Sequence, residues 1–206
     1  MTAEQKTAKR ADIQRALINV DDSMLIVIDV QPPFLAKLPH DEGQLLRDRI
    51  CWLIGVASWL RVPVVVTAED IAREGGVDAQ IVRALPAGVH VYDKMVFDLA
   101  AVPIIMAAVA QTGRRSAILV GLETDVCVAH SALGLLARGY HVAVVADATG
   151  SPGTAHAYGL QRAAGAGALV TNVKSLFYEW IRTVERARQF RAESARTLPT
   201  PNGVRL

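Results

Sequence analysis

The sequence predicts an α/β fold, a three-layer sandwich in which helices cover both faces of a mostly parallel, six-stranded, Rossmann-like sheet. Short apolar runs alternate with longer segments of helical periodicity, as in chains built from strand–helix–strand units. Of the 206 residues, 51% are hydrophobic but only 5% are aromatic, a composition that suits helices packed on parallel strands. This length fits one domain with a substantial core.

Six apolar runs are interpreted as strands, because each is bounded by polar or turn residues. The third run is short, and we expect it at an edge of the sheet. Pro63 stands at the start of the second run, where a missing amide hydrogen is tolerated. The predicted strands are residues 24–30, 62–67, 89–92, 117–120, 142–147 and 168–171.

Helical spacing of apolar residues fills the intervals between these strands. Gly121 breaks the fourth strand, and the helix after it ends at Gly139. The other predicted helices are residues 41–60, 79–85, 100–111, 154–165 and 172–188. Residues 1–20 are predicted to form a polar arm, residues 21–188 the domain, and residues 189–206 a loose polar tail with two prolines.

Charge and cysteine content narrow the class of protein. The net charge of +2 is small and dispersed, so it predicts neither a nucleic-acid partner nor a membrane partner. The only cysteines are Cys51 and Cys127, too few for a disulfide framework, and we expect both to be reduced. Cys51 is interpreted as a packing residue in a helix. The polar N-terminus lacks the apolar core of a signal peptide, which predicts a cytoplasmic location.

Three reactive side chains stand at or just after predicted strand ends. Asp29 follows the first strand, Lys94 the third and Cys127 the fourth. Ligands of parallel α/β sheets bind at the carboxyl ends of the strands, so these side chains are predicted to converge there. The alternatives are that Asp29 and Lys94 form an ion pair that only joins two loops, and that Cys127 is a small buried hydrophobe.

The position of Cys127 also predicts its chemistry. Thr124 and Asp125 are residue types that cap helix starts, so Cys127 is expected in a first helical turn. Free amides at a helix N-terminus favour an anion, which lowers the pKa of a thiol there. The same amides could hold the oxyanion that forms when a thiolate attacks a carbonyl.

Four motifs in sequence order resemble those of the isochorismatase-like cysteine hydrolases, which include nicotinamidases, N-carbamoylsarcosine amidohydrolases and isochorismatases. The resemblance extends over about residues 21–180. Each motif is weak alone, and together they are specific for the family but not for a substrate. They are residues 28–34 (IDVQPPF), 93–97 (DKMVF), 121–128 (GLETDVCV) and 146–148 (ADA).

The resemblance implies a catalytic triad of Asp29, Lys94 and Cys127. It further implies a cis peptide bond before Glu123 and an oxyanion hole made by the amides of Glu123 and Cys127. In the implied reaction, Asp29 takes the thiol proton, the thiolate attacks a small amide, and water hydrolyses the thioester. No cofactor is needed, and the partners implied are a small-molecule substrate and further copies of the chain, in a dimer or tetramer.

Three residues near these motifs are candidates for the wall of a substrate pocket. They are Gln31, Phe34 and Phe97. Gln31 could instead hold the turn at Pro32–Pro33, and Phe34 is equally compatible with the core.

One departure from the family pattern affects the predicted reaction. Nicotinamidases carry an Asp-x-His metal motif after the second strand, where this chain reads TAEDIAR at residues 67–73. We therefore predict a metal-independent amidase. The alternatives are an isochorismatase-type vinyl-ether hydrolase and a non-catalytic thiol sensor or assembly protein on the same fold.

Overall fold

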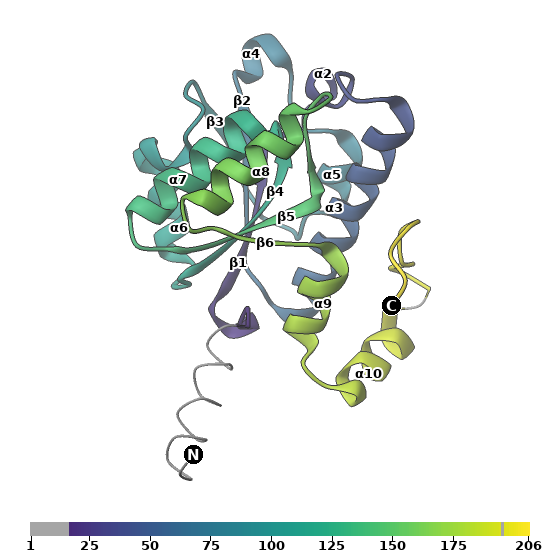
Figure 1. Ribbon diagram of the computed structural model, residues 1–206. Coiled ribbons are helices and arrows are strands. Elements are labelled where there is room, and N and C mark those ends of the chain that lie inside the picture. Colours follow the sequence, from purple (N-terminus) through teal and green to yellow (C-terminus); the bar gives the residue numbers. More distant parts are fainter. Residues whose placement is uncertain (1–16, 195) are drawn as a thin grey trace.

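Six parallel strands form the centre of the protein, in the order β3-β2-β1-β4-β5-β6 (Figure 1). The computed structural model describes residues 17–194 and 196–206. The predicted α/β class is confirmed, and the short third strand does lie at an edge. The strands are β1 (Ser23–Ile28), β2 (Val64–Glu69), β3 (Val91–Lys94), β4 (Ser116–Leu122), β5 (His141–Gly150) and β6 (Leu169–Thr171).

Helices cover both faces of this sheet (Figure 1). One face packs on α3 (His40–Leu60), α5 (Ala79–Ala84), α9 (Val173–Ile181) and α10 (Val184–Ser194). The other packs on α6 (Pro103–Gln111), α7 (Ala129–Ala137) and α8 (Ala155–Gly165). Shorter elements are η1 (Val20–Asp22), α2 (Pro32–Leu35), α4 (Ile71–Glu74), η2 (Leu99–Ala101) and η3 (Thr124–Val128).

Gly121 lets the two central strands meet closely at their carboxyl ends. It pairs with Ile28 across β1 and β4 and has a φ of 120°. A Cβ atom at this position would lie 1.9 Å from the carbonyl oxygen of Ile28, so any larger residue would push the strands apart. The ends of β1 and β4 carry Asp29 and the turn of Cys127, so this contact sets the spacing between them.

The C-terminal part differs from its prediction. The expected helix 172–188 is two helices, α9 and α10, separated at Arg182, which has a φ of 66°. The predicted loose tail is partly packed, because α10 runs to Ser194 and Val204 is 7% exposed. Apolar contacts with α3 hold this segment, and Leu198 lies against Gly55.

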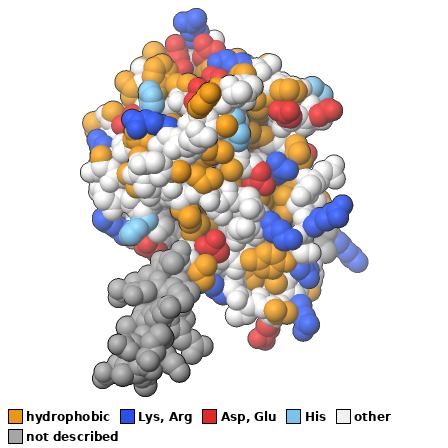
Figure 2. Space-filling view, in the orientation of Figure 1, with side chains coloured by type: hydrophobic (Ala, Val, Ile, Leu, Met, Phe, Trp, Pro, Cys, Tyr) orange, Lys and Arg blue, Asp and Glu red, His pale blue; other side chains and the backbone are white. Residues whose placement is uncertain are grey.

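The surface is mixed in character. Lys and Arg side chains gather over α10 and the C-terminal segment, whereas hydrophobic side chains are visible over α7 and α8 (Figure 2). None of the helices within residues 17–194 and 196–206 has the length and apolarity that crossing a bilayer requires. The predicted arm 1–20 falls mostly outside the described residues, which begin at Leu17.

Candidate functional site

The carboxyl ends of the strands bring Asp29, Lys94 and Cys127 together. The Lys94 ammonium lies 2.6 Å from Asp29 Oδ2, and both side chains are fully buried. It donates to the Cys127 sulfur at 3.4 Å and to the Val96 carbonyl oxygen at 3.1 Å. A lysine buried in this way is tolerated only when its charge is paired, so Asp29 and Lys94 depend on one another.

The backbone at Asp29 turns its carboxylate into the site. Its φ of 49° is left-handed, a region that Asp enters more readily than most residues. The Thr67 hydroxyl donates to Asp29 Oδ1 at 2.8 Å, and the Asp29 amide donates to the Thr67 carbonyl at 3.1 Å. Sequence reasoning missed this role of Thr67, which follows from the pairing of β1 with β2.

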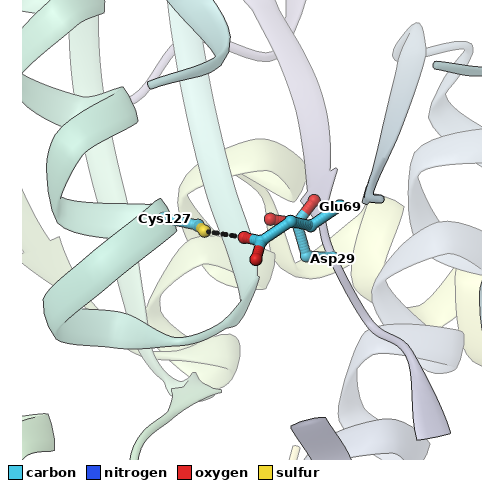
Figure 3. A group of neighbouring side chains, drawn as sticks. All are labelled: Asp29, Glu69 and Cys127. Carbon is cyan, nitrogen blue, oxygen red and sulfur yellow. Dashed lines mark hydrogen bonds between the residues drawn. The ribbon is translucent and has the colours of Figure 1, made fainter. Parts of the chain in front are cut away.

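A second carboxylate, which the sequence analysis also missed, lies at the thiol. Glu69 Oε2 accepts from the Cys127 thiol at 3.0 Å, as drawn in Figure 3, and lies 3.7 Å from Lys94 Nζ. The sequence interpretation ended the second strand at Thr67 and placed Glu69 in a loop. The strand in fact continues to Glu69, which pairs in register with Lys94 on β3.

Gln31 holds the backbone of Glu69. The Glu69 amide donates to Gln31 Oε1 at 2.7 Å, and Gln31 Nε2 donates to the Glu69 carbonyl at 2.9 Å. Gln31 Nε2 also reaches the Gly75 carbonyl at 2.7 Å, and the residue is fully buried. Its amide therefore fixes the loop after β2, rather than the Pro32–Pro33 turn that was the alternative to a pocket role.

Cys127 lies in a π-helical turn, η3, whose N-cap is Glu123. The expected caps do not form, because the Thr124 hydroxyl is engaged with His156 at 2.8 Å. Asp125 accepts from the Ser151 hydroxyl at 2.6 Å instead. The turn is thus tied to α8 and to the loop after β5.

Glu123 connects the end of β4 with this turn. The peptide bond between Leu122 and Glu123 is cis, and Glu123 has an extended backbone. Its carboxylate pairs with Lys37 at 2.5 Å. Glu123 therefore meets the site through its backbone, while its side chain is held by a residue that follows α2.

The charges around Cys127 overturn the predicted lowering of its thiol pKa. Burial raises this pKa, the Asp29 carboxylate raises it further, and the Lys94 ammonium offsets only part of the increase. Burial alone would lower the pKa of Lys94, but Asp29, Cys127 and Glu69 raise it above its ordinary value. The resting site therefore holds a protonated thiol beside a charged ammonium.

The two carboxylates and the sulfur form a compact group of ligand atoms, all within 4.8 Å of one another. Such a group attracts positive charge, and the Lys94 ammonium already supplies it at 2.6 Å and 3.7 Å from the two carboxylates. The negative charge of these ligand atoms is therefore already balanced by the Lys94 side chain.

The two aromatic candidates lie in different environments. Phe34 is 8% exposed and belongs to the core on the α3 face, with Lys37 Nζ 4.7 Å from its ring centre. Phe97 is 49% exposed and packs against the His130 ring, with 5.9 Å between centres. Phe97 is thus the one of the two that an arriving molecule could touch.

A cavity of about 460 Å³ lies between α3 and the loop after β5. Arg49 and Asp147 line it, together with Ser151 and His156, the two residues that tie down the turn of Cys127. None of the three predicted pocket residues belongs to its lining. The cavity thus adjoins the supports of the turn rather than the thiol itself.

Comparisons with known proteins give the family. A secreted isochorismatase effector, Isc1, from Phytophthora sojae is 36% identical over 168 residues, which cover 76% of each chain. The Escherichia coli YcaC protein, described as an octameric hydrolase of unknown specificity, has a TM-score of 0.80 at 20% identity, covering 89% of this chain and 91% of that one. The MAR1 ribonuclease of Caenorhabditis elegans has a TM-score of 0.78 at 24% identity, covering 92% and 98%. The isochorismatase domain matches residues 23–175, and the chain therefore belongs to the isochorismatase family of hydrolases.

Proposed function

We propose that this chain hydrolyses a small-molecule amide through a thioester on Cys127. The observation that carries the proposal is the buried cluster in which one ammonium contacts both the sulfur, at 3.4 Å, and a carboxylate, at 2.6 Å. Covalent acyl transfer uses a nucleophile beside a base, and the fixed positive charge of Lys94 stabilises the thiolate. This geometry favours a catalytic triad over a pair that only joins two loops.

The reaction begins with proton transfer from the thiol to a neighbouring carboxylate, since the thiol rests protonated. The Lys94 ammonium then stabilises the thiolate. The sulfur attacks the amide carbonyl, and the tetrahedral intermediate collapses as the nitrogen departs with the proton. Water attacks the thioester, which releases the acid and restores the thiol. The chain's own groups suffice for these steps.

The negative charge that develops on the carbonyl oxygen needs hydrogen-bond donors. We assign this role to the amides of Glu123 and Cys127, which flank the start of η3. Phe97, exposed beside the segment that follows Lys94, is assigned to the pocket wall. Gln31 acts on the pocket indirectly, through the backbone of Glu69.

The test is ammonia release from a panel of small amides, ureas and N-carbamoyl compounds, with Cys127→Ala in parallel. We expect turnover by the parent protein and none by the variant. Turnover of the same compound by Cys127→Ala would rule out the thioester route. A silent panel combined with hydrolysis of a vinyl ether such as isochorismate would favour the alternative chemistry.

The compartment and the assembly are inferred separately. Cys51 and Cys127 are both free thiols, in keeping with the predicted cytoplasmic location. That location stays a prediction, because the Phytophthora sojae relative is described as secreted. We also propose a homo-oligomer, as its YcaC structural neighbour is described as octameric.

A further inference from the structure

The two carboxylates beside Cys127 have different surroundings. Asp29 is fully buried, with Thr67 on one oxygen at 2.8 Å and Lys94 on the other at 2.6 Å. A carboxylate enclosed in this way is suited to hold the ammonium in place. The Asp29 side chain is closed to solvent, whereas that of Glu69 is 22% exposed.

Glu69 contacts the thiol directly. Its Oε2 accepts the S–H hydrogen bond at 3.0 Å (Figure 3), and its side chain is 22% exposed. Lys94 lies 3.7 Å away, far enough to leave the carboxylate free for the thiol. Two hydrogen bonds with Gln31, one donated and one accepted by its side-chain amide, fix the backbone of Glu69 and so help to hold the carboxylate at the sulfur.

We propose that Glu69 is a further catalytic residue, which takes the proton from Cys127 and returns it to the leaving nitrogen. This inference rests on the proposed function and deepens it. Asp29 then serves as the fixed counter-ion of Lys94. The family resemblance instead implies Asp29 for this proton transfer.

In this scheme Glu69 accepts and returns each proton that moves. The S–H bond breaks and an O–H bond forms on Glu69, while the sulfur electron pair forms the bond to carbon. On collapse the C–N bond breaks, and the proton moves from Glu69 to nitrogen. Water then loses a proton to Glu69 as it attacks the thioester, and that proton returns to the sulfur when the S–C bond breaks.

Several ionisable groups set the local field at Glu69. Asp29 faces it from the end of β1, Lys94 from β3 and Cys127 from η3. Asp70 follows it in sequence, and Asp93 accepts from the Ile71 amide at 3.1 Å. Moving the proton from sulfur to Glu69 leaves the total charge of this group unchanged, so the transfer separates no charge inside the protein.

The experiment measures alkylation of Cys127 by iodoacetamide across a pH series, with the full chain carrying Cys51→Ala and mass spectrometry as the readout. With Glu69 as acceptor, the thiol proton passes directly to the carboxylate, so the rate should have a level region near neutral pH, where this direct transfer is faster than loss of the proton to solvent. In Glu69→Gln the thiol must lose its proton to solvent, so the rate should rise by about tenfold per pH unit, without a level region.

Two further variants make the result decisive. Glu69→Asp keeps a carboxylate, so its alkylation rate should still have a level region, at a lower value. It serves as the second variant if Glu69→Gln does not fold. Glu74→Gln removes a carboxylate that pairs with Arg73 at 3.2 Å, away from the thiol, and should match the parent. A level region that survives in Glu69→Gln, or faster alkylation by this variant at every pH, would overturn the proposal.

Alkylation needs no amide substrate, so its outcome is separable from that of the proposed function. Where an amide is turned over, Glu69→Gln should lower kcat/KM by about 10²–10⁴-fold. If Cys127→Ala keeps that turnover, the proposed function fails whatever Glu69 does. If the amide panel is silent, the alkylation profile still decides the role of Glu69.

Discussion

Lys94 is the residue on which the charge balance of the site depends. Replacing it with Met would leave the Asp29 carboxylate buried without a counter-ion. Breaking a buried pair in this way costs about 3–5 kcal/mol, so Lys94→Met should unfold at markedly lower urea concentration. The double variant Asp29→Asn with Lys94→Met should recover part of the loss. An unchanged urea midpoint for Lys94→Met would contradict this account.

Cys51 gives a pH dependence of stability that is separate from catalysis. Burial, together with Asp48 and Asp78, raises the pKa of its thiol from 9.0 to about 11. Below pH 9 both folded and unfolded chains hold this proton; between 9 and 11 only the folded chain does, so stability falls as pH rises. Above the folded pKa the loss levels off.

The measurement compares melting temperatures of the parent and Cys51→Ala across this window. Cys127 and Lys94 also have raised pKa values, so their loss of a proton at high pH destabilises the folded chain as well. Both proteins should therefore have lower melting temperatures at high pH. The drop should be smaller in Cys51→Ala. Equal drops would show that Cys51 titrates alike in both states.

At the scale of elements, helix α8 supports the turn that carries Cys127. Gly159 lets the helix approach so closely that a Cβ there would lie 2.6 Å from the Asp125 amide nitrogen. Gly159→Ala should therefore displace η3, lower hydrolysis and slow alkylation of Cys127, and destabilise the fold by about 1–3 kcal/mol.

The matched control is Gly165→Ala, at the end of the same helix, where a Cβ would meet nothing within 4 Å. Alanine favours helix over glycine by up to about 1 kcal/mol, so this variant should be as stable as the parent or more so. If both variants behave alike, the close contact of α8 with η3 is not what positions the thiol.

The elements and their order were predictable from the sequence, because hydrophobic residues are spaced differently in buried strands and in helices. The same pattern placed Asp29, Lys94 and Cys127 at strand ends. It could not place Glu69 beside the thiol, because that requires the β2–β3 register and two more strand residues than hydrophobicity indicates. The shift of the thiol pKa was predicted in the wrong direction. The position of Cys127 near a helix start does not indicate that the side chain is buried, nor that carboxylates from other strands lie beside it.

For the whole molecule, we expect assembly into a homo-oligomer. Met95 and Phe97, next to the site, are 72% and 49% exposed, and Ile104 is 62% exposed. Exposed apolar side chains that occur together, here within residues 95–104, are typical of contact surfaces, whereas single ones are ordinary. Light scattering after size exclusion should give a multiple of the chain mass of 22.1 kDa.

Two charge substitutions locate the contact. Met95→Asp should lower the measured mass, whereas Val184→Asp, on α10 and 70% exposed, should not. A parent protein that elutes as a single chain would contradict the oligomer, and dissociation by Val184→Asp alone would move the contact to α10.

The enclosure of the Cys127 sulfur also bears on damage by oxidants. Peroxide attacks thiolates, and a cysteine that is 3% exposed and held as a thiol offers little thiolate to it. The Cys127 thiol should therefore react slowly with peroxide. On the proposed thioester route, activity should therefore persist in an oxidising medium that would convert an exposed, ionised cysteine to its sulfinic acid.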